Sequence, residues 1–552
     1  MGFARRSATI FAAFATVCAM ALSLTACAPD ATEQFASTKE QTTVTSDSVG
    51  TAALFTPSDG ITLNQQTPLN KWAKLTPEIN DALVTYGFKK KNISHTTSDS
   101  LDKQSRAIQD YVVNHLSGKD SSNDSDITIA PENMTLLVAP VVKADDSTRQ
   151  YGDYVSQELS TENAVNEGSA NASDDGNKST DTEAGTGTAD TDSSNSNDNA
   201  ETDADQSQAV QRLVSSLKLA QESGMHVVLL ANSIEGYKPD AFVQFSDARS
   251  IGHMQAEKLA AKLELDKASK DNPKRIEVLL PYTPTDANKN GSSVDSTFAE
   301  EAFQGIWQVL GAYYQKGTVV SPSESLDKSS SDKDWLNVAY DASEDNATTK
   351  ELDRRLGRNG DASNPARIDG IIAMNDYVAS EVVNELNDLG YTGSAADINP
   401  QITIAGIVGN ITGKKDLQRE QVPDPIKSTD DDANGTKDSD DADTKSDKAK
   451  DSQWPLVTGY GAYVSSIPSV VKGKQWMTGI ENRQLLASDI AEVCGKLNTG
   501  EKITGLSAVR NTEVGGVKKV PTLSEPVLAV GASNLKATLI DPGYISLADA
   551  GL

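Results

Sequence analysis

The 552-residue chain is poor in cysteine, with only Cys18, Cys27 and Cys494. Cys18 falls within an apolar leader and Cys27 directly follows that leader, so the mature chain is expected to keep one free thiol and no intrachain disulfide. Cys494 lies in a helical pattern, where a buried small hydrophobe is the expected role. A fold stapled by disulfides is therefore excluded.

Histidine is equally scarce, with 4 residues: His95, His115, His226 and His253. None has a second ligand at metal-site spacing, so we expect no metal and no cofactor. The chain also lacks a Cys/His pair and a Gly-x-Ser-x-Gly elbow after a strand. Asp286 and Asp376 are a candidate carboxylate pair for a glycosidase, but nothing indicates the separation that such chemistry needs. We expect a protein that is not an enzyme.

The net charge of −29 is concentrated in two stretches. Residues 163–208 contain 11 acidic and 1 basic residues, and residues 428–451 contain 9 acidic and 4 basic residues, which together account for −15. Both stretches lack large apolar side chains, so we predict disordered insertions there. Their Asp runs lack a calcium-loop pattern, which favours solvated linkers over a calcium site. The acidity argues against nucleic-acid binding.

The N-terminal residues are expected to form an export leader. Two arginines precede an apolar run from Ala8 to Leu24, a pattern typical of a signal peptide. The ending Leu-Thr-Ala-Cys27 resembles the lipobox of bacterial lipoproteins, which implies a signal peptide over 1–26 and a lipid anchor on Cys27. Residues 27–50 are then expected to form a flexible tether. The alternative is an uncleaved membrane helix, for which the apolar run is near the lower length limit.

Apolar runs of strand type alternate with amphipathic helical patterns along the rest of the chain. The predicted strands are Ala52–Phe55, Met134–Val142, Val227–Ala231, Ile276–Pro281, Ile368–Ala373, Ile402–Val408 and Pro455–Thr458. The predicted helices are Trp72–Gly87, Ser100–His115, Val210–Ser223, Ser250–Leu263, Phe298–Tyr313, Thr348–Leu356, Tyr377–Gly390 and Gln484–Leu497. This alternation predicts an α/β fold, with parallel sheets covered by helices on both faces.

Polar and aromatic residues follow several of the predicted strands. Ligands of open α/β sheets bind beyond the carboxyl ends of the strands, so these residues are the candidate site. They are Lys71, Trp72, Asn232, Asp286, Asn288, Asn375, Asp376, Tyr460 and Tyr463. Amides and carboxylates can bond hydroxyl groups, and aromatic rings can cover a flat ligand. Taken singly, Asp376 could instead cap the next helix and Trp72 could be a core residue.

The order of motifs resembles that of xylose- and ribose-type sugar-binding proteins, the capture subunits of ABC importers. The resemblance is carried by Asn70-Lys-Trp72, Val138-Ala-Pro140, Phe242–Gly252, Thr283–Asn288, Ile368–Asp376, Val457-Thr-Gly459, Gly473–Thr478 and Val520-Pro521. It implies two similar lobes joined by a three-segment hinge that closes on a ligand.

The resemblance also places the lobe limits. The hinge crossings are expected near Phe245–Asp247, Gly459–Tyr463 and Leu523–Pro526. The expected order is 51–245 as the N-terminal lobe, 246–459 as the C-terminal lobe, 460–523 as a return to the first lobe and 524–552 as a return to the second.

Six residues in four places depart from the pattern of that family. Lys71 stands where the family has Arg, Asn232-Ser233 where it has Asp-Arg, and Tyr460-Gly461 where it has Gln-Asp. Glu481 replaces a Lys. These changes predict a divergent ligand site, since a polar site rejects ligands that leave its groups unpaired.

The resemblance implies a monomeric lipoprotein on the outer face of the cytoplasmic membrane. It would capture a small polar ligand, a sugar being expected, and deliver it to an ABC permease. The alternative is a sensing or interaction module on the same scaffold that signals to a membrane receptor.

Overall fold

The structure is a computed structural model that describes residues 49–58, 68–117, 130–142, 146–160, 203–284, 294–357, 366–395 and 453–552. These residues belong to one compact unit, Thr43–Leu552. The leader, Cys27, the acidic insertion at 428–451, Asp286 and Asn288 lie outside the described residues. Within the described ranges, no helix has both the length and the apolar character needed to span a membrane.

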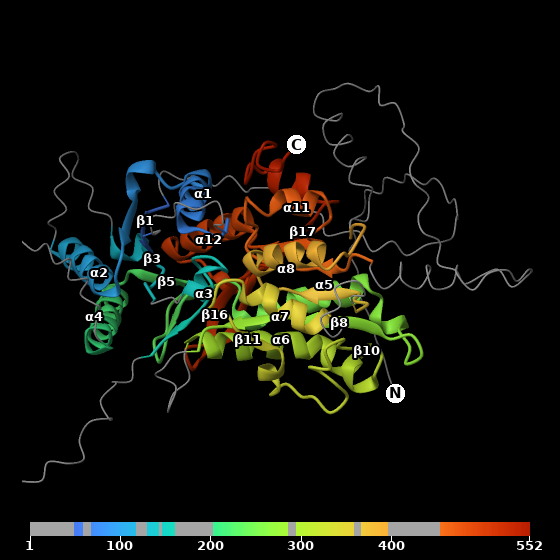
Figure 1. Cartoon of the computed structure of the whole chain (residues 1–552). Coiled ribbons are helices and arrows are strands. Elements are labelled where there is room, and N and C mark those ends of the chain that lie inside the picture. Colours follow the sequence, from blue (N-terminus) through green and yellow to red (C-terminus); the bar gives the residue numbers. More distant parts are fainter. Residues whose placement is uncertain are drawn as a thin grey trace, which may run out of the picture. The chain divides into compact units, whose positions relative to one another are not determined.

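The larger sheet has seven strands in the order β15-β16-β7-β5-β3-β1-β2 (Figure 1). Neighbouring strands are parallel except for the β15–β16 hairpin. The strands are β1 (Thr51–Pro57), β2 (Ile93–Ser98), β3 (Met134–Val138), β5 (His226–Leu230), β7 (Ala241–Gln244), β15 (Val509–Val514) and β16 (Val517–Ser524).

Strand β1 shows why this sheet needs helices on both faces. Ala52 and Leu54 enter one hydrophobic core and Ala53 and Phe55 enter another, as the two-residue period of a strand requires. Helices α1 (Trp72–Tyr86) and α12 (Arg483–Asn498) cover one face, and α2 (Leu101–Leu116) and α4 (Asp203–Glu222) cover the other (Figure 1). The continuous apolar runs of the sequence follow from this double burial.

The smaller sheet has four parallel strands in the order β10-β8-β12-β13. They are β10 (Val319–Val320), β8 (Lys274–Val278), β12 (Gly370–Ile372) and β13 (Leu456–Val457). Ile371 and Ile372 of β12 point into separate cores. Helices α5 (Ala248–Lys262) and α6 (Val294–Lys316) pack together in one of these cores, and α7 (Ala347–Leu356) and α8 (Asp376–Asp388) pack together in the other.

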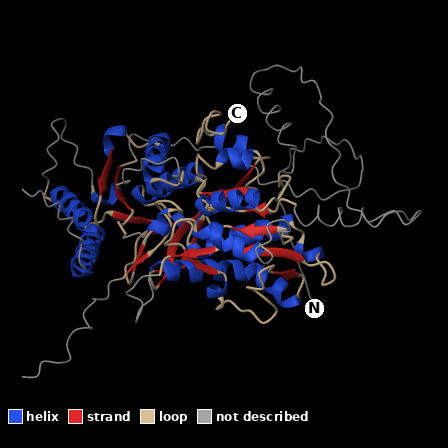
Figure 2. Cartoon of the chain, in the orientation of Figure 1, coloured by secondary structure: helices blue, strands red, loops and turns tan. Residues whose placement is uncertain are grey.

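Shorter elements complete the described chain (Figure 2). Two-stranded sheets pair β9 (Leu280–Tyr282) with β11 (Ala339–Asp341), β14 (Met477–Ile480) with β17 (Leu528–Gly531), and β4 (Glu158–Leu159) with β6 (Ser233–Ile234). The remaining helices are α3 (Asp146–Arg149) and α11 (Ile467–Val471). Single turns cover Lys90–Asn92, Pro131–Asn133, Leu265–Lys267, Trp335–Asn337, Ile503–Gly505 and Lys536–Ile540.

The chain crosses three times between the larger sheet with its helices and the smaller sheet with its helices. It leaves the larger sheet after β7 and enters α5, and it leaves again between β16 and β17. Between these passages it returns through α12, which packs against α1. Because β14 pairs with β17, we propose that this return lies near Glu481, about twenty residues after Gly459–Tyr463.

The described structure confirms the α/β class and most of the predicted elements. Each of the eight predicted helices overlaps an observed helix, and six of the seven predicted strand runs overlap observed strands. Ile402–Val408 lies outside the described residues. Strands β2, β7, β15 and β16 of the larger sheet were not predicted. Strands β2 and β15 lie at the two edges of the sheet, expose at least half of their residues and lack an apolar run. Lysines interrupt β16, and β7 has only four residues.

Two predicted boundaries are wrong by a few residues. Residues 203–208, predicted to belong to a disordered insertion, are helical, since α4 begins at Asp203. Acidic residues are also favoured in the first turn of a helix, so acidic composition alone misplaced this boundary. Residues 49 and 50, predicted to belong to the tether, are part of the folded unit, because Val49 is buried in the core with α1 and α12.

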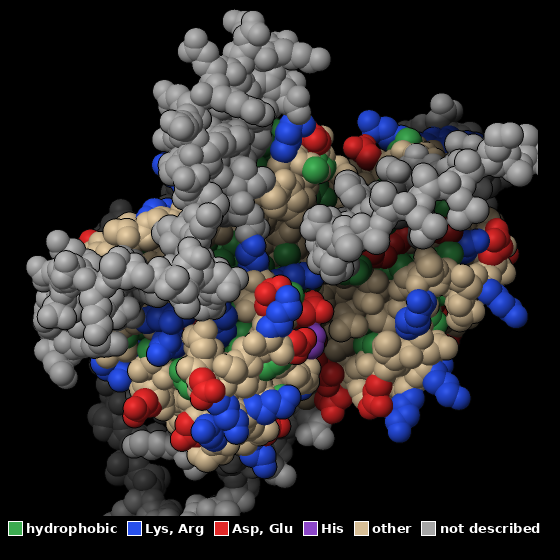
Figure 3. All heavy atoms as spheres, turned by 90° about the vertical axis from the view of Figure 1, so that its right-hand side faces the viewer, with side chains coloured by type: hydrophobic (Ala, Val, Ile, Leu, Met, Phe, Trp, Pro, Cys, Tyr) green, Lys and Arg blue, Asp and Glu red, His purple; other side chains and the backbone are tan. Residues whose placement is uncertain are grey.

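Basic and acidic side chains are interspersed over the face of the molecule that Figure 3 presents. The strongly acidic stretch at 428–451 and most of the stretch at 163–208 lie outside the described residues. These two stretches contribute about half of the net charge of the chain, −15 of −29.

The contact between α5 and α6 leads to a stability prediction. A Cβ atom on Gly252 would lie 2.2 Å from the Ala302 carbonyl oxygen, and that oxygen belongs to the facing helix backbone. Gly252→Ala should therefore lower the free energy of unfolding by about 1–3 kcal/mol. Gly505→Ala is the control, because a Cβ atom there meets nothing within 4 Å. Equal urea midpoints for the two variants would contradict this packing.

Candidate functional site

The polar ends of strands from both sheets meet at one place, which we call the junction. The described candidate residues there come from the loop after β1, the end of β5, the start of α8 and the loop after β13: Lys71, Trp72, Asn232, Asn375, Asp376, Tyr460 and Tyr463. Asp286 and Asn288 belong to a loop outside the described residues. A stretch of the chain between α3 and β4, Gln150–Gln157, lies among these side chains, and we call it the junction segment.

Lys71 and Trp72 both contact the junction segment. Lys71 Nζ lies 2.7 Å from Asp153 Oδ1, and the backbone N–H of Trp72 donates to Asp153 Oδ2 over 3.2 Å. The Trp72 ring is 2% exposed and packs edge-on against Tyr154, with ring centroids 5.1 Å apart. It packs in the same way against Phe245 at 6.0 Å. In this structure Trp72 is thus part of the core under α1.

Asn232 follows β5 and is also buried. Its Nδ2 donates to the Pro140 carbonyl oxygen over 2.9 Å, and its Oδ1 accepts from the Gln157 N–H over 3.0 Å. The preceding Ala231 has φ +61, a left-handed conformation that is uncommon outside glycine. Asn232 therefore ties the end of β3 to the junction segment.

Asn375 caps helix α8. Its Oδ1 accepts from the Val378 N–H over 2.9 Å, which is the standard N-cap bond. Its Nδ2 donates to Gln150 Oε1 over 3.1 Å. The residue that caps the helix is thus Asn375 and not Asp376, and the amide nitrogen of Asn375 faces the junction segment.

Asp376 is fully buried and has three hydrogen bonds. Oδ1 accepts from Gln475 Nε2 over 2.7 Å, and Oδ2 accepts from the Tyr463 N–H and Thr478 Oγ1, each over 2.9 Å. Burial raises the pKa of Asp376 to about 6, although the hydrogen bonds from Tyr463, Gln475 and Thr478 lower it. Gln475 and Thr478 belong to the segment around β14 and Tyr463 belongs to the loop after β13, so Asp376 joins α8 to both.

The hydroxyl groups of the two tyrosines after β13 bond different parts of the chain. The Tyr463 hydroxyl donates to the Gln150 carbonyl oxygen over 2.7 Å. The Tyr460 hydroxyl donates to Glu481 Oε1 over 3.1 Å, and that oxygen also accepts from the Ser246 N–H over 2.8 Å. Burial raises the pKa of Glu481, and the bonds from Ser246 and Tyr460 oppose the rise.

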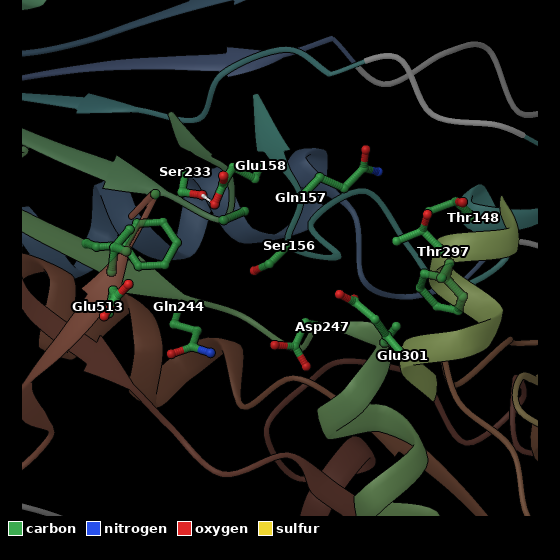
Figure 4. A pocket seen from close by; sticks show the side chains of 16 residues that line it. Thr148, Ser156, Gln157, Glu158, Ser233, Gln244, Asp247, Thr297, Glu301 and Glu513 are labelled. Atoms are coloured by element: carbon green, nitrogen blue, oxygen red, sulfur yellow. Dashed lines mark hydrogen bonds between the residues drawn. The ribbon is translucent and has the colours of Figure 1, made fainter. Parts of the chain in front are cut away.

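A pocket of about 490 Å³ lies beside the junction segment (Figure 4). Its lining comes from β4, from the passage between β7 and α5, from the start of α6 and from β15. Ser156, Asp247 and Glu301 point into it (Figure 4), and Phe242 and Phe298 contribute apolar surface. Burial and the neighbouring Asp247 raise the pKa of Glu301. The volume falls within the range of small-molecule sites.

Sequence reasoning did not find the junction segment. One signal was available: Tyr151-Gly-Asp-Tyr-Val155 places two aromatic residues and a valine within an otherwise polar stretch. Tyr151 and Tyr154 are 2% and 1% exposed, which is unusual for a loop that only connects two elements. The lining of the pocket by Glu158, Glu301 and Glu513 was missed as well, because no motif marks these positions.

No family model matches the chain. Among curated proteins, "Multiple sugar-binding periplasmic protein SbpA" of Azospirillum brasilense is 36% identical over 92 residues, which is 16% of this chain and 24% of that protein. The matched stretch thus spans about a quarter of that relative.

The structural neighbours of this chain are sugar-binding proteins of ABC transporters. One is an ABC transporter solute-binding protein of Clostridium phytofermentans with bound β-D-glucose (TM-score 0.43, 15% identity, 90% of this chain and 99% of that chain). Another is a carbohydrate transporter solute-binding protein of Chloroflexus aurantiacus in complex with D-glucose (TM-score 0.44, 16% identity, 90% and 97%).

The raised pKa of Asp376 predicts a pH dependence of stability. An unfolded aspartate titrates near pH 4, about 2 units lower, so the folded state holds the proton more tightly by about 3 kcal/mol. This contribution is present below about pH 4 and is lost as the pH rises through about 6. Asp376→Asn cannot ionise and should remove that loss, as measured by denaturation at pH 4 and pH 7.

The control for this measurement is Asp271→Asn, which changes an exposed aspartate away from the junction. It should keep the pH profile of the parent chain. A profile for Asp376→Asn that matches the parent between pH 4 and pH 7 would show that Asp376 does not titrate in this range.

Proposed function

We propose that the protein is an extracytoplasmic solute-binding lipoprotein that captures a small polar ligand, a sugar, and delivers it to an ABC importer. The observation that carries the proposal is the meeting of polar strand ends from two sheets at the junction. Lys71 and Asn232 come from the larger sheet, and Asn375 and Tyr463 come from elements around the smaller one. A ligand that bonds both groups favours the state in which they are close together.

The chemistry of the junction suits a hydroxylated ligand. Amides and an ammonium group can form hydrogen bonds of fixed direction. The rings of Trp72 and Tyr460 lie beside these groups, buried against Tyr154 and Tyr151 in this structure. The local match to a multiple sugar-binding protein supports the same class of ligand. The departures from the related sequence pattern, at Lys71, Asn232 and Tyr460, argue for a specificity other than that of ordinary xylose binders.

The proposal is binding without chemical conversion. Asp376, the described member of the carboxylate pair considered for hydrolysis, has both oxygens engaged by donors from its own part of the fold. A glycosidase requires one carboxyl group to protonate the leaving oxygen and a second to attack or activate water. Asp376 is placed to hold β14 and α8 together, which is a structural role.

Titration with sugars tests the proposal directly. The chain without its leader should be stabilised by at least one of D-xylose, D-ribose and D-glucose, by about 2.7 kcal/mol at a concentration of 100 times Kd. Thermal shift and calorimetry measure this, and L-glucose is the matched control because only its handedness differs from D-glucose. The absence of a thermal shift and of a heat of binding with all three sugars would contradict the proposal that the ligand is a sugar.

The lipid anchor has its own test. Cells grown with labelled palmitate should incorporate label into the wild-type chain and into Cys494→Ala, but not into Cys27→Ser. Cys494 is buried and serves as the matched cysteine control. Mass spectrometry of the mature N-terminus should find Cys27 acylated. An unlabelled chain that keeps residues 1–26 would favour an uncleaved membrane helix.

A further inference from the structure

The polar side-chain groups that are proposed to bind a ligand already bond other residues of the chain. Four candidate residues direct polar side-chain atoms at the junction segment: Lys71, Asn232, Asn375 and Tyr463. Their partners are the Asp153 carboxylate, the Gln157 N–H, the Gln150 side chain and the Gln150 carbonyl oxygen. The segment thus presents to these residues the carboxylate, amide and carbonyl groups that an external polar ligand would replace.

The aromatic faces are covered in the same way. Tyr154 packs on Trp72, with ring centroids 5.1 Å apart, and Tyr151 lies 6.4 Å from Tyr460 and 4.5 Å from Phe298. A sugar that used Trp72 or Tyr460 as a platform would occupy the space that these two tyrosines fill. Backbone bonds fix the segment in place, from Asp153 N–H to the Asn70 carbonyl over 2.8 Å and from Ser156 N–H to the Ser246 carbonyl over 3.1 Å.

The fit of the segment is incomplete. Four buried side-chain atoms in or next to it find no hydrogen-bond partner among the described residues: Asn70 Nδ2, Trp72 Nε1, Thr148 Oγ1 and Tyr154 OH. Leaving such groups unpaired is unfavourable. A ligand with several hydroxyl groups would offer acceptors to Asn70 Nδ2 and Trp72 Nε1, which the segment leaves unpaired. These two donors therefore favour such a ligand over the segment.

The segment also borders the open pocket. Ser156 and Gln157 belong to it, Thr148 and Glu158 flank it, and all four line the 490 Å³ space (Figure 4). Departure of the segment would therefore join the pocket to the space around Lys71, Asn232 and Asn375, giving one larger site.

We propose that Gln150–Gln157 is an internal latch that occupies the ligand site and must leave before a sugar can bind. The inference rests on the proposed function and adds a regulation of the same site. With a latch, the apparent affinity for sugar is the intrinsic affinity multiplied by the fraction of molecules in which the latch is released. Weakening its contacts should therefore tighten sugar binding without any new contact to the sugar.

Hydrogen exchange tests whether the latch is resident and displaceable. In the chain without added sugar, the amides of Asp153, Ser156 and Gln157 should exchange slowly, because each donates a hydrogen bond. A saturating amount of the sugar that binds best should speed their exchange. Amides of β5 are the internal control, since they belong to the sheet in either state. Fast exchange without sugar, or slow exchange with sugar bound, would overturn the latch.

A double variant tests the competition. Gln150→Ala with Asp153→Ala removes the side-chain contacts to Asn375, Lys71 and the Trp72 N–H, and it should raise the apparent sugar affinity roughly tenfold. The control is Glu264→Ala, which removes the exposed ion pair to Lys267 at 2.7 Å and should leave affinity unchanged. Weaker binding by the double variant would overturn the latch and place the segment in the sugar site as a ligand-binding element.

The two proposals fail in different ways. If neither the parent chain nor the double variant binds D-xylose, D-ribose or D-glucose, while Asp153, Ser156 and Gln157 stay protected, the sugar-binding function falls and the segment stands as a permanent occupant of the junction. If both bind with equal affinity, the function stands and the latch falls.

Discussion

The structure depends on pairing the polar groups that lie buried where the two sheets meet. Strand ends carry unpaired backbone and side-chain groups, and leaving one of them buried without a partner costs about 1–3 kcal/mol. Glu481 pairs several of these groups. Its carboxylate accepts hydrogen bonds from the Ser246 N–H and the Tyr460 hydroxyl. Its own N–H donates to Asn70 Oδ1 over 3.3 Å. Glu481 thus bonds three separate parts of the chain, at Asn70, Ser246 and Tyr460.

This arrangement explains two departures from the related sugar-binding pattern together. Tyr460 stands where the pattern has Gln, and Glu481 stands where it has Lys. Considered separately, each looks like the loss of a group that grips a sugar. In the structure they bond each other, so the two replacements form one local hydrogen bond. Where that pattern has a glutamine and a lysine, the junction has a tyrosine–carboxylate pair that bonds within the chain.

The sequence predicted the strands and helices well because burial on both faces leaves a strong pattern. Leu136, Leu137 and Val138 of β3 are all apolar since the strand faces a core on each side. Strand β16 was missed because Lys518 and Lys519 interrupt any such run. The α/β class could therefore be predicted from local pattern alone, whereas the edge of the larger sheet could not.

The candidate site was harder to predict, because its contacts join distant parts of the chain. The positions of Asn232 and Asn375 after predicted strands indicated that they could contact a ligand, but not which residues of the chain they contact. The bond between Tyr463 and Gln150 spans 313 residues, and no local periodicity encodes such a pair. Trp72 shows the same limit: its position after a strand suggested a ligand contact, while its burial against Tyr154 and Phe245 depends on tertiary packing.

The burial of Cys494 has a practical consequence. Its side chain is enclosed between α1 and α12 and the larger sheet, and burial raises its pKa, so it holds little reactive thiolate at neutral pH. Within the described chain it is the one native thiol. A cysteine introduced on an exposed helix would consequently react with maleimide dyes with little background labelling of Cys494. Paired fluorophores on α2 and α7 could then follow the separation of the two sheets in a single molecule.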